Sequence, residues 1–357
     1  MFLYWSIWFV IYLFSILANE KLLSKLIYFV FIIFLIIFVG WRYEIGVDWD
    51  TYLIFYETIK DFHFKEAILF TEPLYGLLNY ISSILEFDDT VFVNLICAII
   101  LFFTFFVFSK KINNYWVPLL VSYTYFIVVV SMNYTRQSVA VAFSLLAFYY
   151  ALRKNIIKFI IFVILATLFH KSAIVLLVYI PLIYFNNTNI NIFFKISYTL
   201  FSLFFITFIL FYSSLSSDSL YLGAGEDLNS SGAIFRVFLH VFPVLLFLCY
   251  RRVFRECYKE NLIILDYSLL LIVYCLFLAF LYSTLADRFN LYLLFFDIIV
   301  FSFLSRFFKL NKKLILLSLI FFYYSVSFYI WFDFGTYADD GWIPYQNYLF
   351  NFLTEIF

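Results

Sequence analysis

Twelve apolar segments, most of them long enough to cross a lipid bilayer, dominate the sequence. A transmembrane helix needs about 20 consecutive apolar residues, and shorter segments can tilt or enter the membrane only in part. Only 13% of the 357 residues are charged and 66% are hydrophobic, whereas about a quarter of a water-soluble protein is charged. The composition therefore excludes a soluble enzyme, a disordered chain and a nucleic-acid-binding protein. The segments lie at about 2–18, 26–40, 90–108, 115–131, 137–152, 156–169, 173–185, 193–212, 234–250, 262–285, 289–305 and 314–332.

We expect these segments to be helices, because in hydrocarbon an α-helix satisfies its own backbone hydrogen bonds. The predicted fold class is all-α: a polytopic integral membrane protein of about 12 transmembrane helices, forming one transmembrane domain over residues 1–357. Its predicted outer parts are a loop at 41–89 with a short helix at 73–86, a mobile Ser- and Gly-rich loop at 213–233 and a tail at 333–357.

The basic residues set the predicted orientation. Lys and Arg collect on the inner side of membrane proteins, and sixteen of the 23 basic residues fall in alternate loops that we assign to the inside. Both chain ends then lie outside. The seven basic residues left on the outer face are functional candidates, because orientation does not explain them. They are Arg42, Lys60, Lys65, Arg136, Lys171, Arg236 and Arg288.

Arg136 lies at the outer end of an apolar segment, in the polar run 133–137. At helical spacing Asn133, Gln137 and Ser144 share its face, which predicts a polar stripe entering the membrane. The planar fork of a guanidinium suits a phosphate or a carboxylate. The alternative is an interfacial arginine whose stem lies along apolar surface, although the neighbouring amides favour a polar cavity.

His170 ends another apolar segment on the predicted outer side, beside Lys171. An imidazole can accept or deliver a proton near neutral pH, so His170 is our first candidate for a general base. The alternative is an interfacial histidine with a structural role. His63, in the outer loop, and His240, within a segment, are weaker candidates.

Two further charged positions have open interpretations. Arg288 follows Asp287 between two segments, so it either marks a tight outer turn or binds a ligand. Asp297 lies within a segment, seven residues after Asn290 and on a similar helix face. A carboxylate in lipid is costly unless it is neutral or paired, so we expect Asp297 to face the interior of the bundle.

A second outer cluster holds one base and three acids: Arg42, Asp48, Asp50 and Glu72. Such carboxylates can ligate a divalent ion or bind sugar hydroxyls, and the aromatic residues nearby offer flat faces to sugar rings. The alternative is a solvated loop with an interfacial aromatic belt. Two neighbouring aspartates support a metal only weakly, so we predict no metal site. Together with the outer arginines and His170, the pattern favours an anion that arrives from the lipid interface, a lipid-linked phosphate.

Six short motifs follow one another along the chain. They are Gly46-x-Asp48-x-x-x-Tyr52, Glu72-Pro73-Leu74-Tyr75, Asn133-x-x-Arg136-Gln137-x-x-Ala140, Phe169-His170-Lys171-Ser172, Arg288-x-x-x-Tyr292 and Pro344-Tyr345. In this order, over roughly residues 40–345, they resemble the EpsG family of Wzy-type bacterial polysaccharide polymerases.

The resemblance implies a multi-pass glycosyltransferase of the bacterial inner membrane, active at its periplasmic or extracellular face, in O-antigen, capsule or exopolysaccharide synthesis. Its substrates would be oligosaccharide repeat units linked to undecaprenyl diphosphate, and the growing glycan would move as a block onto a newly flipped unit. The resemblance implies no cofactor and no nucleotide sugar. The partners that it implies are membrane lipid, a chain-length regulator and a repeat-unit flippase. No nucleic-acid partner is expected.

This chemistry assigns roles to the outer residues. The leaving diphosphate gains charge as the glycosidic bond breaks, and fixed guanidinium groups stabilise such charge. We predict Arg136 and Arg288 as catalytic residues, with Arg42 as a third diphosphate ligand. His170 is the predicted catalytic base for the acceptor hydroxyl, with Asp48 or Asp50 in reserve. The predicted substrate-binding residues are Arg42, Asp48, Asp50, Trp49, Tyr52, Glu72 and Gln137.

Three other functions remain open. A polysaccharide or O-antigen ligase would use the same reaction class but move finished polymer to a different acceptor. A membrane O-acyltransferase also needs an intramembrane histidine, but its acyl donor commonly comes from the inner side, whereas His170 is predicted outside. A lipid-linked oligosaccharide flippase or transporter needs a polar path through both leaflets. The charges that orientation does not explain lie on the predicted outer face, except for Asp297, which keeps this alternative open.

Overall fold

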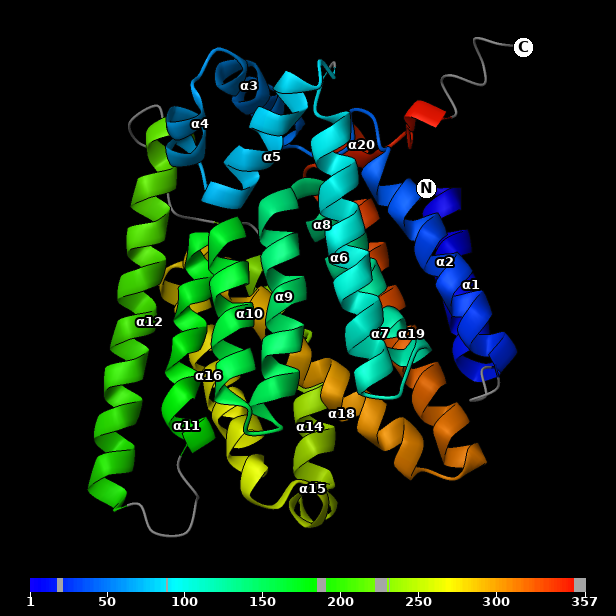
Figure 1. Cartoon of the computed structure of the whole chain (residues 1–357). Helices are drawn as coiled ribbons and strands as arrows, with labels where there is room; N and C mark the ends of the chain where they lie inside the picture. The colour runs from blue at the N-terminus through cyan, green and yellow to red at the C-terminus, as the bar shows by residue number, and fades with distance from the viewer. Residues whose placement is uncertain (18–21, 88, 185–190, 222–229, 231, 350–357) are drawn as a thin grey trace. The chain divides into compact units, whose positions relative to one another are not determined.

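The computed structural model describes residues 1–17, 22–87, 89–184, 191–221, 230 and 232–349 (Figure 1). Across these residues the structure is helical, with no strand and a single isolated bridge between Arg42 and Asn347. The predicted all-α class is therefore confirmed for the described part of the chain.

Within these residues, seven helices are long and apolar enough to cross a membrane. They cover Leu23–Gly40, Val91–Lys111, Trp116–Asn133, Phe193–Tyr212, Arg251–Leu281, Ser283–Phe307 and Leu310–Phe334. Shorter apolar helices cover Phe2–Leu17, Ile156–Phe169, Lys171–Tyr184 and Ala233–Cys249. The chain is thus a multi-pass membrane protein, whereas the total of about 12 spans and the identity of the outer face stay predictions.

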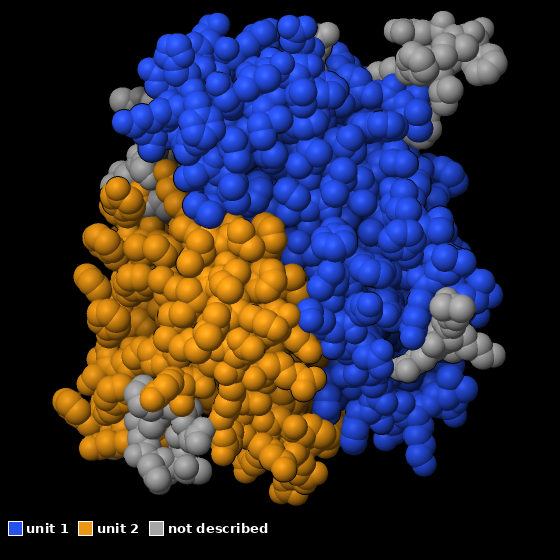
Figure 2. Space-filling view, viewed as in Figure 1, with its two compact units in different colours: residues 1–142, 168–170, 302–357 blue, residues 143–167, 171–301 orange. Residues whose placement is uncertain are grey.

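The chain divides into two compact units, coloured separately in Figure 2. Unit 1 comprises residues 1–142, 168–170 and 302–357, and unit 2 comprises residues 143–167 and 171–301. This division does not test the prediction of one transmembrane domain, which stays a prediction.

Unit 1 contains both ends of the chain and the predicted outer segment 41–89. Its helices are α1 (Phe2–Leu17), α2 (Leu22–Gly40), α3 (Trp49–Lys60), α4 (Phe64–Phe70), α5 (Pro73–Ile84), α6 (Val91–Lys111), α7 (Trp116–Ser122), the π-helical η1 (Tyr123–Val130), α8 (Ser131–Asn133), the start of α9 (Thr135–Ala151), the ends of α10 (Ile156–Phe169) and α18 (Leu294–Phe307), α19 (Leu310–Phe334) and α20 (Ala338–Trp342). Within this unit α2 packs against α6, and Gly40 allows the close approach because a Cβ there would press on Leu95 and Ala98.

Buried aromatic side chains with paired polar atoms fix the chain after the last long helix of unit 1. Tyr4 donates a hydrogen bond to the carbonyl of Trp342 at 3.0 Å, and Tyr123 donates to the carbonyl of Tyr4 at 3.0 Å. The indole of Trp342 donates to the carbonyl of Val128 at 2.9 Å. Because buried polar groups require partners, these bonds hold α20 against α1 and η1.

The segment 41–89, predicted to be a loop with one short helix, forms three short helices grouped at one end of unit 1, α3, α4 and α5 (Figure 1). Helix α5 lies within the predicted range 73–86 and begins with Pro73, a residue that suits the first helical position since it has no amide hydrogen to satisfy. Helix α4 begins with a reciprocal capping box between His63 and Glu66. These local signals position Glu72 just before α5.

Unit 2 holds the middle of the chain. Its helices are the rest of α9, most of α10 (Ile156–Phe169), the 3₁₀ helix η2 (Lys171–Tyr179), α11 (Ile180–Tyr184), α12 (Ile192–Tyr221), α13 (Ala233–Phe238), α14 (Val241–Cys249), α15 (Arg251–Tyr258), η3 (Lys259–Asn261), α16 (Leu262–Leu281), α17 (Ser283–Asn290), η4 (Leu291–Leu293) and most of α18 (Leu294–Phe307). Helix α12 continues to Tyr221, so the first part of the loop predicted at 213–233 is helical. Residues 222–229 and 231 of that loop lie outside the described residues.

Candidate active site

Three of the predicted site residues come together in unit 1. The carboxylate of Glu72 accepts a hydrogen bond from Arg136 Nη1 at 2.6 Å through Oε2 and contacts His170 Nδ1 at 3.1 Å through Oε1. Glu72 is 5% exposed and His170 is also buried. One carboxylate thus joins two residues that sequence analysis assigned to catalysis, and we call Glu72, Arg136 and His170 the buried cluster.

The helix that carries Arg136 starts at a break in the chain. Helix α8 ends at Asn133, Tyr134 leaves the helical conformation with φ −95° and ψ 64°, and α9 begins at Thr135. The predicted polar stripe is therefore wrong as one continuous helix face, because Asn133 belongs to the preceding helix. The break places Arg136 in the first turn of α9, where the helix dipole already favours negative charge.

Aromatic rings surround the guanidinium of Arg136. Its central carbon lies 5.8 Å from the ring centroid of Tyr52, 5.1 Å from that of Phe55 and 5.7 Å from that of Tyr75. These distances lie within the range of cation–π attraction. Helices α3 and α5 supply the three rings, so they and Glu72 together fix the direction of the guanidinium.

The electrostatics of the buried cluster keep Glu72 ionised. Burial alone would raise the pKa of the Glu72 carboxyl, but the charge of Arg136 and the hydrogen bond from His170 outweigh it and hold that pKa well below its ordinary value. An ionised carboxylate only accepts hydrogen bonds, so Nδ1 of His170 carries the ring proton. In the neutral ring, Nε2 is then the nitrogen that can accept a proton, which is the arrangement of a carboxylate-oriented general base.

Arg42, predicted to bind substrate, has a different environment. It is 1% exposed, and burial lowers the pKa of its guanidinium, with nearby tyrosines opposing the change. Its hydrogen bonds go to the carbonyl oxygens of Val39, Ile45 and Met132 and to the side-chain oxygens of Asn94 and Thr135. This geometry favours a structural role, in which Arg42 ties the end of α2 to α6 and to the break before α9, over contact with a substrate.

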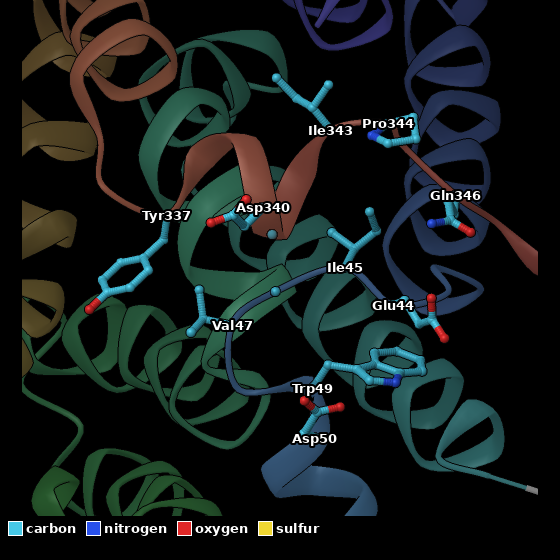
Figure 3. Close-up of a pocket in the computed structure, with 12 residues that line it drawn as sticks. Glu44, Ile45, Val47, Trp49, Asp50, Tyr337, Asp340, Ile343, Pro344 and Gln346 are labelled. Carbon is cyan, nitrogen blue, oxygen red and sulfur yellow. The ribbon is translucent and has the colours of Figure 1, made fainter.

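The other predicted substrate-binding residues lie at or near α3. The backbone N–H of Asp48 donates to Asn133 Oδ1 at 2.9 Å, which joins the start of α3 to the end of α8. Trp49, which is buried, and Asp50, which is exposed, line a pocket with residues around α20 (Figure 3). The ring of Tyr52 faces Arg136. Gln137, the residue after Arg136 on α9, is buried. The pocket residues Tyr337, Asp340 and Gln346 were not predicted; the polar run after the last apolar segment was the available signal.

Arg288 lies in unit 2 and is half-buried in the last turn of α17. Asp287 is in the same helix, so these two residues do not form the tight turn considered above. Instead Asp287 accepts hydrogen bonds from Arg236 at 2.6 Å and 2.9 Å. The structure therefore gives Asp287 a partner 51 residues away in sequence.

Unit 2 also explains the intramembrane acid. Both oxygens of Asp297 lie within 2.8 Å of His240 Nδ1, and His240 Nε2 lies 2.8 Å from Asn290 Oδ1. All three residues are buried. Asn290 ends α17 and Asp297 lies in α18, with the 3₁₀ turn η4 between them, and the ring of His240 contacts both. Within the described residues, no group of three or more His, Cys, Asp or Glu side chains is arranged to hold a metal ion.

The model of the EpsG family matches residues 25–347, nearly the whole chain. The chain belongs to the EpsG family. This is a Wzy-like family of polysaccharide polymerases, so the resemblance seen in the six motifs is confirmed. A search of curated proteins gives no match, and a search of solved structures gives none. EpsG membership implies a glycosyltransferase-type polymerase in exopolysaccharide or O-antigen synthesis, and the matched range includes the buried cluster.

Proposed function

We propose that this EpsG-family chain polymerises oligosaccharide repeat units carried on undecaprenyl diphosphate, at the outer face of the bacterial cytoplasmic membrane. The observation that carries the proposal is the buried cluster, in which Glu72 bonds both Arg136 and His170. It combines an oriented base with a fixed cation, the two groups that glycosyl transfer from a diphosphate requires.

In the proposed step the growing glycan is the donor and a hydroxyl of the new lipid-linked unit is the acceptor. Nε2 of His170 takes the hydroxyl proton while the acceptor oxygen bonds to the anomeric carbon of the donor. The bond from that carbon to the diphosphate oxygen breaks, and undecaprenyl diphosphate leaves with the electron pair. Glu72 stabilises the imidazolium that forms, as a carboxylate does in hydrolytic triads.

Arg136 is proposed to stabilise the leaving diphosphate. Its guanidinium is held by Glu72 and three aromatic rings, so it needs little reorganisation as charge develops. It also lies in the first turn of α9, and the partial positive charge of that helix end adds to its effect. With His170 protonated the buried cluster carries a net positive charge, which matches the departing anion.

Other predicted residues keep proposed roles in the same reaction. Arg288 of unit 2 is proposed as a second diphosphate ligand. Asp48, Asp50, Trp49 and Gln137 are proposed to contact sugars. A repeat-unit flippase would supply the acceptor, and a chain-length regulator would limit the product.

Alanine replacement of His170, Arg136 and Arg288, one at a time, tests the proposal. In cells that lack the native gene, each variant should leave single repeat units on the lipid carrier in place of a ladder of polymer on a gel. His63→Ala and Lys65→Ala, both exposed in the same outer segment, are the matched controls and should restore the ladder. Full-length polymer from all three variants, present in the membrane at normal amounts, would refute the mechanism. Long lipid-linked polymer that is never attached would identify a ligase instead.

A further inference from the structure

A pocket lies in unit 1 where the chain before α3 meets the chain around α20 (Figure 3). Its volume is about 530 Å³, which falls in the range of small-molecule sites. Backbone hydrogen bonds hold its two walls together: the N–H of Gly46 donates to the carbonyl of Gly341 at 2.8 Å, and the N–H of Tyr43 donates to the carbonyl of Gln346 at 3.1 Å. Gly46 has a φ of +102°, and a Cβ at this position would overlap the carbonyl of Met132. The backbone that forms the walls of the pocket is therefore held in place within unit 1.

The lining joins aromatic rings to hydrogen-bond acceptors. Trp49 and Tyr337 supply the rings, and Glu44, Asp50 and Asp340 supply three exposed carboxylates. In Figure 3 Tyr337 and Asp340 lie at one end of the pocket and Glu44 and Trp49 at the other. Among the described residues that line it, none is Lys, Arg or His.

This lining selects by charge. Carboxylates only accept hydrogen bonds, so they suit a ligand with hydroxyl or ammonium donors. A ligand carboxylate or phosphate also only accepts, and three like charges around it repel it. The aromatic rings add flat apolar faces against which the C–H face of a sugar ring can pack.

Helix α3 links the pocket to the buried cluster. Trp49 and Asp50, in its first turn, line the pocket, whereas Tyr52 and Phe55 farther along face the guanidinium of Arg136. With a rise of 1.5 Å per residue, Trp49 and Tyr52 are separated by about 4.5 Å along the helix axis. One short helix therefore carries side chains of both the pocket and the environment of the buried cluster, so a sugar next to the reacting one is the occupant we consider for the pocket.

We infer that this pocket is a sugar subsite that takes neutral or amino sugars and rejects acidic ones. The inference rests on the proposed function, because it names the class of glycan that this polymerase uses. It assigns a binding role to Asp340, Tyr337 and Glu44, which line the pocket with the predicted residues Trp49 and Asp50.

Binding of three disaccharides with one skeleton tests the subsite: neutral cellobiose, its diamino analogue chitobiose and the anionic cellobiouronic acid. The full-length protein in nanodiscs is titrated with each sugar, and binding is followed by saturation-transfer NMR. Cellobiouronic acid should bind at least about fivefold more weakly than cellobiose, because one unit charge at about 4 Å changes an affinity by that factor even in water. Chitobiose should bind at least as tightly as cellobiose. Equal affinities for the three sugars would overturn the inference.

A charge reversal with a neighbouring control sharpens the test. Asp340→Lys should raise the affinity for cellobiouronic acid by about fivefold or more relative to cellobiose. Asp339→Lys makes the same change at the adjacent exposed residue of α20, which does not line the pocket, and should shift the ratio much less. Equal shifts in both variants would refute the subsite. This binding assay needs no turnover, so it can fail while the His170→Ala test succeeds, and the reverse also holds.

Discussion

Replacing Glu72 by glutamine keeps the size of the side chain at the centre of the buried cluster but removes its charge. In the structure Oε2 faces Arg136 Nη1 at 2.6 Å and Oε1 faces His170 Nδ1 at 3.1 Å. Arginine can only donate, so the amide oxygen of a glutamine has to face Arg136, and its NH₂ group then faces Nδ1. A ring nitrogen opposite a donor must accept, which moves the ring proton to Nε2. In the proposed mechanism, this change removes the base that accepts the hydroxyl proton.

Two separate magnitudes follow from Glu72→Gln. Loss of a correctly protonated general base should lower the transfer rate by about 10²–10⁴-fold. The guanidinium of Arg136, only 14% exposed, also loses its counter-ion. Breaking a buried ion pair costs about 3–5 kcal/mol. The lower end, about 3 kcal/mol, is expected here, because the rings of Tyr52, Phe55 and Tyr75 continue to stabilise the cation.

The assay is transfer by purified protein between lipid-linked repeat units, with thermal unfolding recorded in the same detergent. We expect kcat to fall while KM changes little, since in the proposed mechanism Glu72 acts through His170 and Arg136 and does not itself contact the sugars. Glu66→Gln is the matched control: Glu66 is an exposed acid of the same segment, and glutamine also serves in its capping box. A Glu72→Gln enzyme that transfers at the wild-type rate would refute the orientation of His170 by this carboxylate.

Four further outcomes are expected, each measurable by thermal unfolding. The folded-state pKa of Glu72 lies below its ordinary 4.5, so ionised Glu72 stabilises the folded protein fully above that pH. As the pH falls below 4.5, the wild type should lose up to about 1.4 kcal/mol of folding stability per pH unit. A Glu72→Gln variant that loses stability equally fast with falling pH would contradict this. Arg42→Ala should destabilise by about 3–5 kcal/mol, as it removes a buried charge and leaves its acceptors without a donor, and a small change would argue for a binding role. Gly46→Ala should cost at least about 1–3 kcal/mol, because the positive φ is strained for alanine and its Cβ would also overlap the carbonyl of Met132. Unchanged unfolding would show that the loop can adapt. In unit 2, Asp297→Ala should cost at least about 1–3 kcal/mol by leaving buried His240 without this acceptor, and wild-type stability would show that His240 finds another.

The sequence identified the class of protein and pointed to several residues of the candidate site, because both rest on local properties. Each apolar segment reports by its own length and hydropathy that it belongs in lipid, and helices do occur in the predicted ranges. Arg136 and His170 stood out because each lies at the end of an apolar segment, on the predicted outer side, where basic residues are disfavoured. The six motifs indicated membership of the EpsG family, and the match of the family model over residues 25–347 confirms it.

Only the tertiary structure decided what each charged residue does. Arg42 and Arg136 are alike in sequence, each placed at the end of an apolar segment, yet Arg42 is enclosed by backbone and amide oxygens while Arg136 faces a carboxylate. Glu72 lies 64 residues from Arg136 and 98 from His170 along the chain. Hydrophobic periodicity predicts which face of a helix is apolar. It does not predict which distant part of the chain will pack against that face. The contacts that could make a catalytic site from these residues depend on packing across the whole unit, and so do the walls of the pocket beside it.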